Sequence, residues 1–288
     1  MKPTIDFQIQ IKDHAMDNKQ LLDIIEQNAT DAVKVLHLFN QNIKLLPPEI
    51  YQLSHLEELG LSGNQLTVLS PDIKKLKNLK VLYLSNNQLT SLPLQIGQLR
   101  RLKLLYLADN QITTLPTNLG KLSHLETLVL ENNQLQDLPS SMGQLSRLKV
   151  LIVNNNQLKT LPHTFHHLSQ LEVLALNNNQ LKTLPDKICQ LSQLKQLIVS
   201  NNRLTSLPFQ LEELSQLEKL VLFDNRLPLP LALLKQVEKP WRIIHASNRQ
   251  WLKQQMAQER GLEIRSRVMV FLLVGMFFLL MAHFNGEL

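Results

Sequence analysis

The sequence is poor in cysteine, glycine and aromatic residues. Its 288 residues include a single cysteine, Cys189, which excludes a disulfide framework and a zinc site built from cysteines. With 8 glycines, 13 prolines and 5% aromatic residues, collagen-like and prion-like compositions are excluded as well. The hydrophobic content of 44% exceeds that of a disordered tail, so the chain predicts at least one folded core.

Motifs that would indicate an enzyme are also missing. The chain has no phosphate-binding loop, no HExxH zinc motif and no paired-carboxylate motif, so we expect no catalytic residue and no cofactor. His163, His166 and His167 lie close together, but a metal site usually needs four ligands in fixed geometry, so no metal site is predicted. Cys189 has no positioned base and is interpreted as an inert surface residue.

What is present is a repeat with a constant period of 23 residues. Nine turns follow one template without an insertion or deletion. Within one turn, apolar residues stand at Leu102, Leu105, Leu107, Ile112, Leu115, Leu119 and Leu122. The alternation of Leu105 and Leu107 predicts a short strand with one inward face. The first anchors of the nine turns are Val33, Leu56, Leu79, Leu102, Leu125, Leu148, Leu171, Leu194 and Leu217.

Two polar columns punctuate each turn. An asparagine follows eight of the nine predicted strands, and we expect its amide to bond neighbouring backbone groups as a structural ladder. A proline then opens the return segment, where its fixed torsion suits an extended start or a first helical turn; Ser70 breaks this column once. The asparagines are Asn64, Asn87, Asn110, Asn133, Asn156, Asn179, Asn202 and Asn225.

The pattern LxxLxLxxNxLxxLPxxIxxLxx resembles the leucine-rich repeat, in the 23-residue LP-containing form of plant intracellular Ras-group-related proteins and Roco-type repeat domains. This resemblance implies an α/β solenoid, a horseshoe with a parallel β-sheet on its concave side. The family binds many unrelated proteins and has no catalytic motif to transfer. Small GTPases or other signalling proteins follow as partners by analogy only.

The flanks are expected to cap the solenoid. Residues 1–32 form an N-terminal cap with an amphipathic helix from Asp17 to Asn28, and residues 33–239 hold the nine repeats. Residues 240–264 are interpreted as a C-terminal cap, in which Ile243 keeps the register of a degenerate tenth repeat before a linker helix. Residues 265–288 are interpreted as a C-terminal transmembrane helix that anchors the chain.

The anchor is predicted from an uncharged apolar run. Residues 268–282 read VMVFLLVGMFFLLMA, and His283 and Phe284 extend the run to 17 residues, near the lower limit for a membrane span. Arg260, Arg265 and Arg267 precede it, so a single-pass anchor with the repeats facing the cytoplasm is expected. Residues 1–30 contain no secretory leader. The alternative is that the run packs on the repeats or on another copy.

The outward strand positions form an apolar platform that indicates partner binding. Tyr83 and Tyr106 should be adjacent, because neighbouring strands lie about 4.8 Å apart. A contiguous exposed apolar patch usually marks an interaction surface, and tyrosine is enriched at binding hot spots. The alternative is that valine and isoleucine stand there because they favour strands. The candidate residues are Tyr83, Leu104, Tyr106, Val129, Val150, Ile152, Val173 and Ile198.

Charge does not indicate a nucleic-acid partner. The 30 basic and 24 acidic residues leave a net charge of +6. One column of the repeat alternates in sign and is nearly neutral, which argues against phosphate binding. Its members are Lys80, Lys103, Glu126, Lys149, Glu172, Lys195 and Glu218.

The sequence is compatible with two functional hypotheses. The first is a non-catalytic scaffold, anchored at the membrane by residues 268–284, that docks a protein on its concave face. The second is a soluble structural oligomer whose apolar tail and concave face serve self-association.

Overall fold

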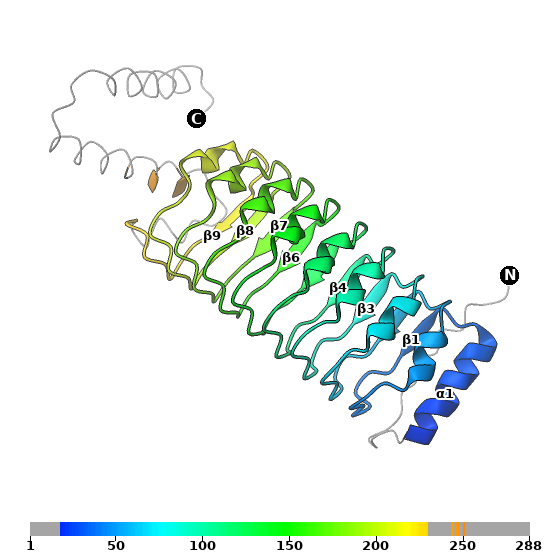
Figure 1. The fold of residues 1–288 in the computed structure, drawn as a ribbon. Helices are drawn as coiled ribbons and strands as arrows, with labels where there is room; N and C mark the ends of the chain where they lie inside the picture. The colour runs from blue at the N-terminus through cyan, green and yellow to red at the C-terminus, as the bar shows by residue number, and fades with distance from the viewer. Residues whose placement is uncertain (1–17, 230–242, 245, 248–249, 251–288) are drawn as a thin grey trace, which may run out of the picture.

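The computed structural model describes residues 18–229, together with residues 243–244, 246–247 and 250. Helix α1 (Asn18–Asp31) is followed by parallel strands that pair strictly in chain order, nine of them within these residues (Figure 1). The strands are β1 (Val35–His37), β2 (Glu58–Gly60), β3 (Val81–Tyr83), β4 (Leu104–Tyr106), β5 (Thr127–Val129), β6 (Val150–Ile152), β7 (Val173–Ala175), β8 (Gln196–Ile198) and β9 (Lys219–Val221).

The register of the sheet follows from the period of the sequence. Each strand residue pairs with the residue 23 positions later, as in Leu82 with Leu105 and Tyr83 with Tyr106. The central residue of every strand is buried, and the residue before it is half-buried on the opposite face of the sheet. A register slip of one residue would expose the whole set of central leucines, so this pairing is strongly specified.

Each return segment contains one short 3-10 turn. Proline precedes all but one of these turns among the described residues, with φ between −54° and −68°, and so supplies an extended residue just before the turn. Ser70 replaces it once, and its Oγ accepts a hydrogen bond from the N–H of Asp72 at 3.2 Å. The turns are η1 (Pro48–Gln52), η2 (Pro71–Lys75), η3 (Leu94–Gln98), η4 (Thr117–Lys121), η5 (Ser140–Gln144), η6 (His163–His167), η7 (Asp186–Gln190) and η8 (Phe209–Glu213).

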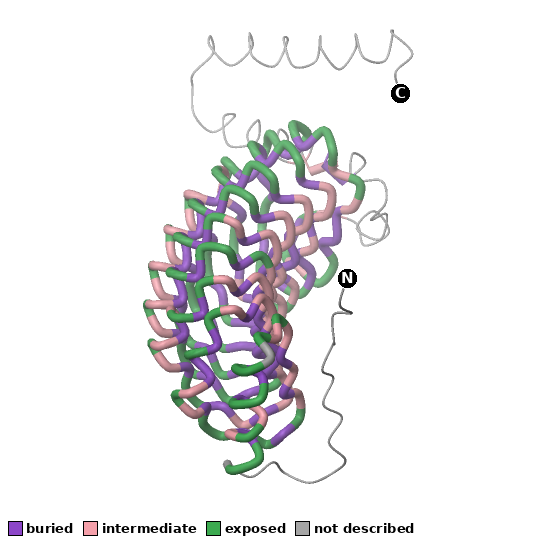
Figure 2. Tube along the Cα trace, turned by 90° about the vertical axis from the view of Figure 1, so that its right-hand side faces the viewer, coloured by how far each residue is buried: buried purple, intermediate pink, exposed green. Residues whose placement is uncertain are grey.

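One continuous hydrophobic core runs through the solenoid between the sheet and the 3-10 turns. Figure 2 shows the turns stacked into a curved rod, with buried residues along its interior. At the front, α1 packs against η1 and adds Leu21 and Ile25 to the core. At the back, Ile243 and Ile244 are buried in the same core. The strands line the inner, concave side of the rod, and the 3-10 turns form its convex side.

The rest of the expected C-terminal region lies outside the described residues. This holds for most of the degenerate tenth repeat, for the linker helix and for the apolar run of residues 268–284. Among the described residues, no helix has the length and apolar character needed to cross a membrane.

The prediction that Cys189 lies at the surface is wrong. Cys189 lies in η7, where it is buried. Its burial, and to a smaller extent the negative charges of Glu213 and Asp186, raise the pKa of its thiol to about 11. It occupies the column of Gly97, Gly120 and Gly143, which faces the backbone of the next turn. At these four positions the column therefore holds a small residue where adjacent turns pack closely.

We expect Gly120→Ala to lower the free energy of unfolding by roughly 1–3 kcal/mol, because the added methyl group overpacks this contact. A Cβ at Gly120 would lie 2.2 Å from the backbone oxygen of Ser141, which cannot rotate away as a side chain can. Urea denaturation of the variant measures the loss. Thr117→Ala changes an exposed residue of the same turn and serves as the control; equal stability of the two variants would contradict the close packing.

Candidate functional site

The eight asparagines of the predicted ladder lie directly after the strands and bind the backbone of two adjacent turns. For Asn133, Oδ1 accepts from the N–H of Ile112 at 2.9 Å, and Nδ2 donates to the carbonyls of Leu107 at 2.8 Å and Leu130 at 3.1 Å. The other seven repeat these contacts. All are buried except Asn225, which is half-buried, so the ladder is part of the scaffold.

A second polar column, beside this ladder, was not predicted from the sequence. Its residues have positive φ, between 50° and 74°, a conformation that asparagine, aspartate and glycine tolerate best. In the sequence, the signal for this conformation was that only asparagine, aspartate and glycine occur in the column. Asn132, Asn155 and Asn178 each donate from Nδ2 to the previous member of the column, ending on Asp109. The column is Asn40, Gly63, Asn86, Asp109, Asn132, Asn155, Asn178, Asn201 and Asp224.

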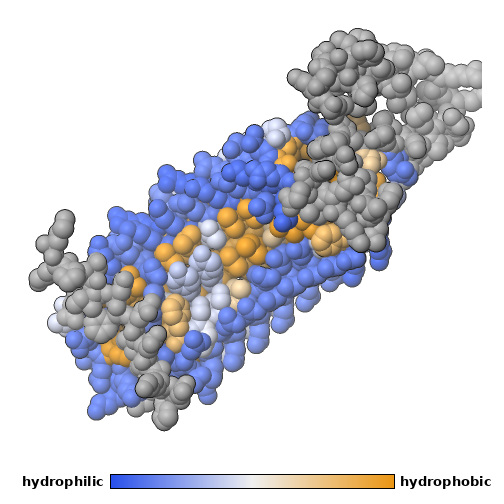
Figure 3. Space-filling view, turned by 180° about the vertical axis from the view of Figure 1, so that it is seen from behind, coloured by the Kyte–Doolittle hydropathy of each residue, from blue (hydrophilic) through white to orange (hydrophobic). Residues whose placement is uncertain are grey.

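The candidate platform residues all lie on the outward face of the sheet, on strands β3 to β8. The side chain of each is half-buried, and residues of the adjacent strands flank it. Figure 3 shows an apolar stripe along this face, flanked on both sides by hydrophilic residues. The aliphatic half of the stripe, which we call the aliphatic platform, consists of Val129, Val150, Ile152, Val173 and Ile198; Leu104 lies between it and the tyrosines.

The other half is aromatic and larger than the sequence predicted. The rings of Tyr83 and Tyr106 stack, with centroids 5.0 Å apart and 14° between their planes. Phe39 and His37 continue the cluster, with the Phe39 centroid 5.9 Å from that of Tyr83. Gly60 makes room for them, because a Cβ there would lie 2.5 Å from the Phe39 ring. The absence of a side chain in the column at Gly60 was the signal for this arrangement.

One carboxylate lies within the aromatic half. The distance between Oε1 of Glu58 and Nε2 of His37 is 2.7 Å, so the carboxylate contacts the imidazole ring directly. Partial burial, and then the negative charge of Glu58, raise the pKa of the Tyr83 hydroxyl. Tyr83 therefore stays protonated at neutral pH and presents a hydrogen-bond donor beside an apolar surface.

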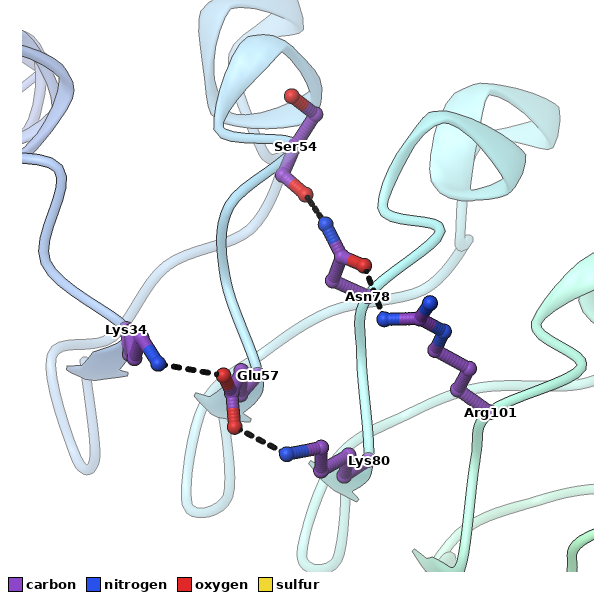
Figure 4. A network of polar contacts seen from close by, with 6 residues as sticks. All are labelled: Lys34, Ser54, Glu57, Asn78, Lys80 and Arg101. Carbon is purple, nitrogen blue, oxygen red and sulfur yellow. Dashed lines mark hydrogen bonds and ion pairs between the residues drawn. The ribbon is translucent and has the colours of Figure 1, made fainter.

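Polar rims border the platform. Where the strands begin, Lys34 and Lys80 both contact the carboxylate of Glu57 (Figure 4). The hydrogen bond from Lys80, and then that from Lys34, lower the pKa of the Glu57 carboxyl to about 2. Where the strands end, Asn154 and Asn177 accept hydrogen bonds at 2.9 Å from backbone N–H groups of the following turns. The platform is thus an apolar strip between two hydrogen-bonding rims.

The described residues do not bring a reactive set of side chains together. They contain no group of three or more histidine, cysteine or acidic side chains arranged to hold a metal ion. His166 instead bonds the backbone oxygen of His163 through Nδ1 at 2.6 Å, and its ring lies 4.0 Å from that of His167. The arrangement on the concave face is suited to contact with another molecule through shape, apolar area and hydrogen bonds.

Family models match most of the repeat region. The model described as leucine-rich repeat matches residues 54–112 and 169–227, and the model described as leucine-rich repeat region matches residues 95–174. No curated protein matches the chain significantly.

Several solved structures are similar to this chain. A leucine-rich repeat protein of Leptospira interrogans has a TM-score of 0.65 and 36% identity, over 75% of this chain and 62% of its own. A second is the leucine-rich repeat ectodomain of the plant membrane receptor kinase GASSHO1/SCHENGEN3 from Arabidopsis thaliana, in complex with CASPARIAN STRIP INTEGRITY FACTOR 2. Its TM-score is 0.63 and its sequence identity is 33%, and the match covers 68% of this chain and 24% of the receptor chain. A third is the plant peptide hormone receptor RGFR1 in complex with RGF2. Its TM-score is 0.56 and its sequence identity is 26%, and the match covers 70% of this chain and 38% of the receptor chain.

This chain spans less than two thirds of the length of each of these three structures. The family models together match residues 54–227, which contain the repeated unit of strand, turn and return segment. The repeat region of this chain therefore belongs to the leucine-rich repeat family.

Proposed function

We propose that this chain is a non-catalytic scaffold that docks a protein partner on its concave face. The observation that carries the proposal is the apolar stripe, with the stacked pair Tyr83 and Tyr106 at its aromatic end and the aliphatic platform beyond it. Central aromatic and aliphatic side chains surrounded by polar rims are the usual composition of a protein-binding hot spot.

The neighbours of known structure support this proposal. Two of them are plant receptors whose structures were solved in complex with a named partner. By analogy with them, we assign a peptide or protein partner to the present chain. The constant 23-residue repeat with its proline further suggests kinship with Ras-group-related and Roco-type repeats, and hence a signalling protein such as a small GTPase as partner.

The apolar run of residues 268–284 completes the proposal as a membrane anchor. Its length is near that of a membrane-spanning helix, and Arg260, Arg265 and Arg267 before it favour a cytoplasmic position for the repeats. Anchoring would raise the local concentration of the scaffold and its partner at the membrane surface.

The test is the double variant Tyr106→Glu and Ile152→Glu in the full chain. Two carboxylates in the middle of the stripe should weaken capture of partners by at least roughly tenfold, because they would be desolvated on binding. Quantitative cross-linking and mass spectrometry in cells measure capture. Thr117→Glu and Ser140→Glu place the same charges on the exposed convex turns of neighbouring repeats and are the control.

Unchanged capture by a folded double variant would contradict the proposal. Sedimentation of both proteins over a concentration range distinguishes the alternative function. If the wild-type size grows with concentration and that growth disappears in the double variant, then the concave face serves self-association.

A further inference from the structure

One side of the solenoid carries a concentrated positive charge. We call it the lateral face: the loops that lead from the end of each 3-10 turn to the next strand. In four successive loops, residues 75–80, 98–103, 121–126 and 144–149, it carries nine lysines and arginines and one carboxylate, Glu126. The basic residues are Lys75, Lys77, Lys80, Arg100, Arg101, Lys103, Lys121, Arg147 and Lys149.

The same face reverses its sign further along the rod. The next three loops, residues 167–172, 190–195 and 213–218, carry one lysine against three glutamates. Because adjacent turns are in strict register, the basic loops lie side by side and their charges add. The positive charge is therefore confined to the turns from η2 to β6.

Most of this charge is not neutralised by ion pairs. Lys77, Arg100, Lys121 and Arg147 are exposed, and none makes an ion pair within the described residues. Arg101 donates only to the amide oxygen of Asn78, at 2.7 Å, and Asn78 in turn donates to the backbone of Ser54 (Figure 4).

Two of the carboxylates that approach this face are each shared by two lysines, whereas Asp72 pairs with Lys75 alone, at 2.8 Å. Glu126 lies between Lys103 at 3.7 Å and Lys149 at 3.2 Å, and Glu57 lies between Lys34 and Lys80. One carboxylate cannot neutralise two ammonium groups, so a positive excess remains even within the alternating column. The column judged nearly neutral from the sequence is thus the more acidic part of a basic face.

We propose that this basic lateral face lies against the anionic lipid headgroups of a membrane. Clusters of four to eight basic residues bind anionic membrane surfaces electrostatically. The four basic loops contain no phenylalanine, tyrosine or tryptophan on which nucleic-acid bases would stack. The choice of a lipid surface over another polyanion rests on the proposed function, because the proposed anchor would hold the repeats beside a membrane.

This orientation leaves the platform accessible. The lateral loops lie at the edge of the sheet where each strand begins, beside the concave face and not on it. A solenoid lying on this edge keeps its concave face open to a partner that moves along the membrane surface.

The experiment uses fluorophores on the full chain, attached to one of two serines of the same column. Ser146→Cys lies in a basic loop, and Ser215→Cys lies in an acidic loop; both serines are exposed, and native Cys189 is buried. The chain is mixed with vesicles of phosphatidylcholine alone, or of phosphatidylcholine with phosphatidylserine, that carry a headgroup quencher. The readouts are attachment to vesicles by flotation and quenching of each label.

A charge-reversed variant and a matched control complete the design. Lys77→Glu, Arg100→Glu and Arg147→Glu reverse three exposed charges of the basic face, and Lys182→Glu, Lys187→Glu and Arg203→Glu make the same net change at exposed residues outside its four loops. We expect quenching at residue 146 to exceed that at residue 215 several-fold on anionic vesicles. The contrast should vanish in the charge-reversed variant, persist in the control, and vanish near 1 M salt, where the Debye length is about 3 Å.

The outcomes separate this inference from the proposed anchor. Attachment to both kinds of vesicle with equal quenching at the two labels overturns the basic face and leaves the anchor standing. Attachment to anionic vesicles alone, lost in the charge-reversed variant, supports the face and contradicts the anchor. Retention of RNA at about 0.15 M salt that depends on the three charges, without any contrast on vesicles, assigns the face to nucleic acid and overturns the lipid proposal.

Discussion

Leu151→Ala should lower the free energy of unfolding by roughly 2–5 kcal/mol. Leu151 is the central residue of β6, its side chain is fully buried, and the core around it continues without interruption into the turns on either side. Truncation removes three carbon atoms from this packing and leaves a cavity that neighbouring turns, fixed by their register, cannot close. Leu128→Ala in β5 should have the same effect, because Leu128 pairs directly with Leu151.

Urea denaturation followed by circular dichroism measures this loss. The control is Ile152→Ala, one residue along the same strand but on the outward face and half-buried, for which we expect about 1 kcal/mol or less. A similar loss for Leu151→Ala and Ile152→Ala would contradict the assignment of faces on which both the core and the platform depend.

Asn133→Ala should cost roughly 2–4 kcal/mol, because one amide serves several backbone groups at once. The variant removes the acceptor of the Ile112 N–H and the donor to the carbonyls of Leu107 and Leu130. Asn133 is 7% exposed, so water cannot easily replace these contacts. Each buried polar group left without a partner costs about 1–3 kcal/mol, and partial relaxation reduces the sum.

The matched control is the adjacent residue, Asn132→Gly. Asn132 is exposed, and its φ of 54° is one that glycine adopts without strain. Its side chain bonds only other side chains of the exposed column, so we expect a change within about 0.5 kcal/mol. Hydrogen exchange of the Ile112 amide reports the local effect; a rate unchanged by Asn133→Ala would contradict the role of the ladder.

The stacking of Tyr83 on Tyr106 illustrates what a repeat makes predictable. A constant period of 23 residues places equivalent residues on adjacent parallel strands, and alternation along the strand assigns each residue to one face. These two rules place Tyr83 beside Tyr106, and Val129 beside Ile152, before any coordinates are known; the structure has both pairs in register. They also place the asparagine column at the turn after eight of the nine strands.

The aromatic end of the platform required the structure. Phe39 stands in an outward column whose other members are mostly small and polar, so its own column gave no reason to join it to Tyr83. The missing side chain at Gly60 lets the rings of Phe39 and His37 lie across the second turn. Such contacts depend on the direction of side chains across two turns, which a column-by-column comparison of the repeats cannot supply.

The sequence by itself determined the period, the register, the inward leucines and the outward platform, because each depends only on spacing along the chain. The tertiary structure decided how closely neighbouring turns approach and which charges gather on one side. The close approach of the 3-10 turns buried Cys189, and the stacking of four loops joined Lys77, Arg100 and Arg147 into one basic face. The burial of Cys189 and the basic face both depend on contacts between neighbouring turns. The sequence of a single turn does not contain this information.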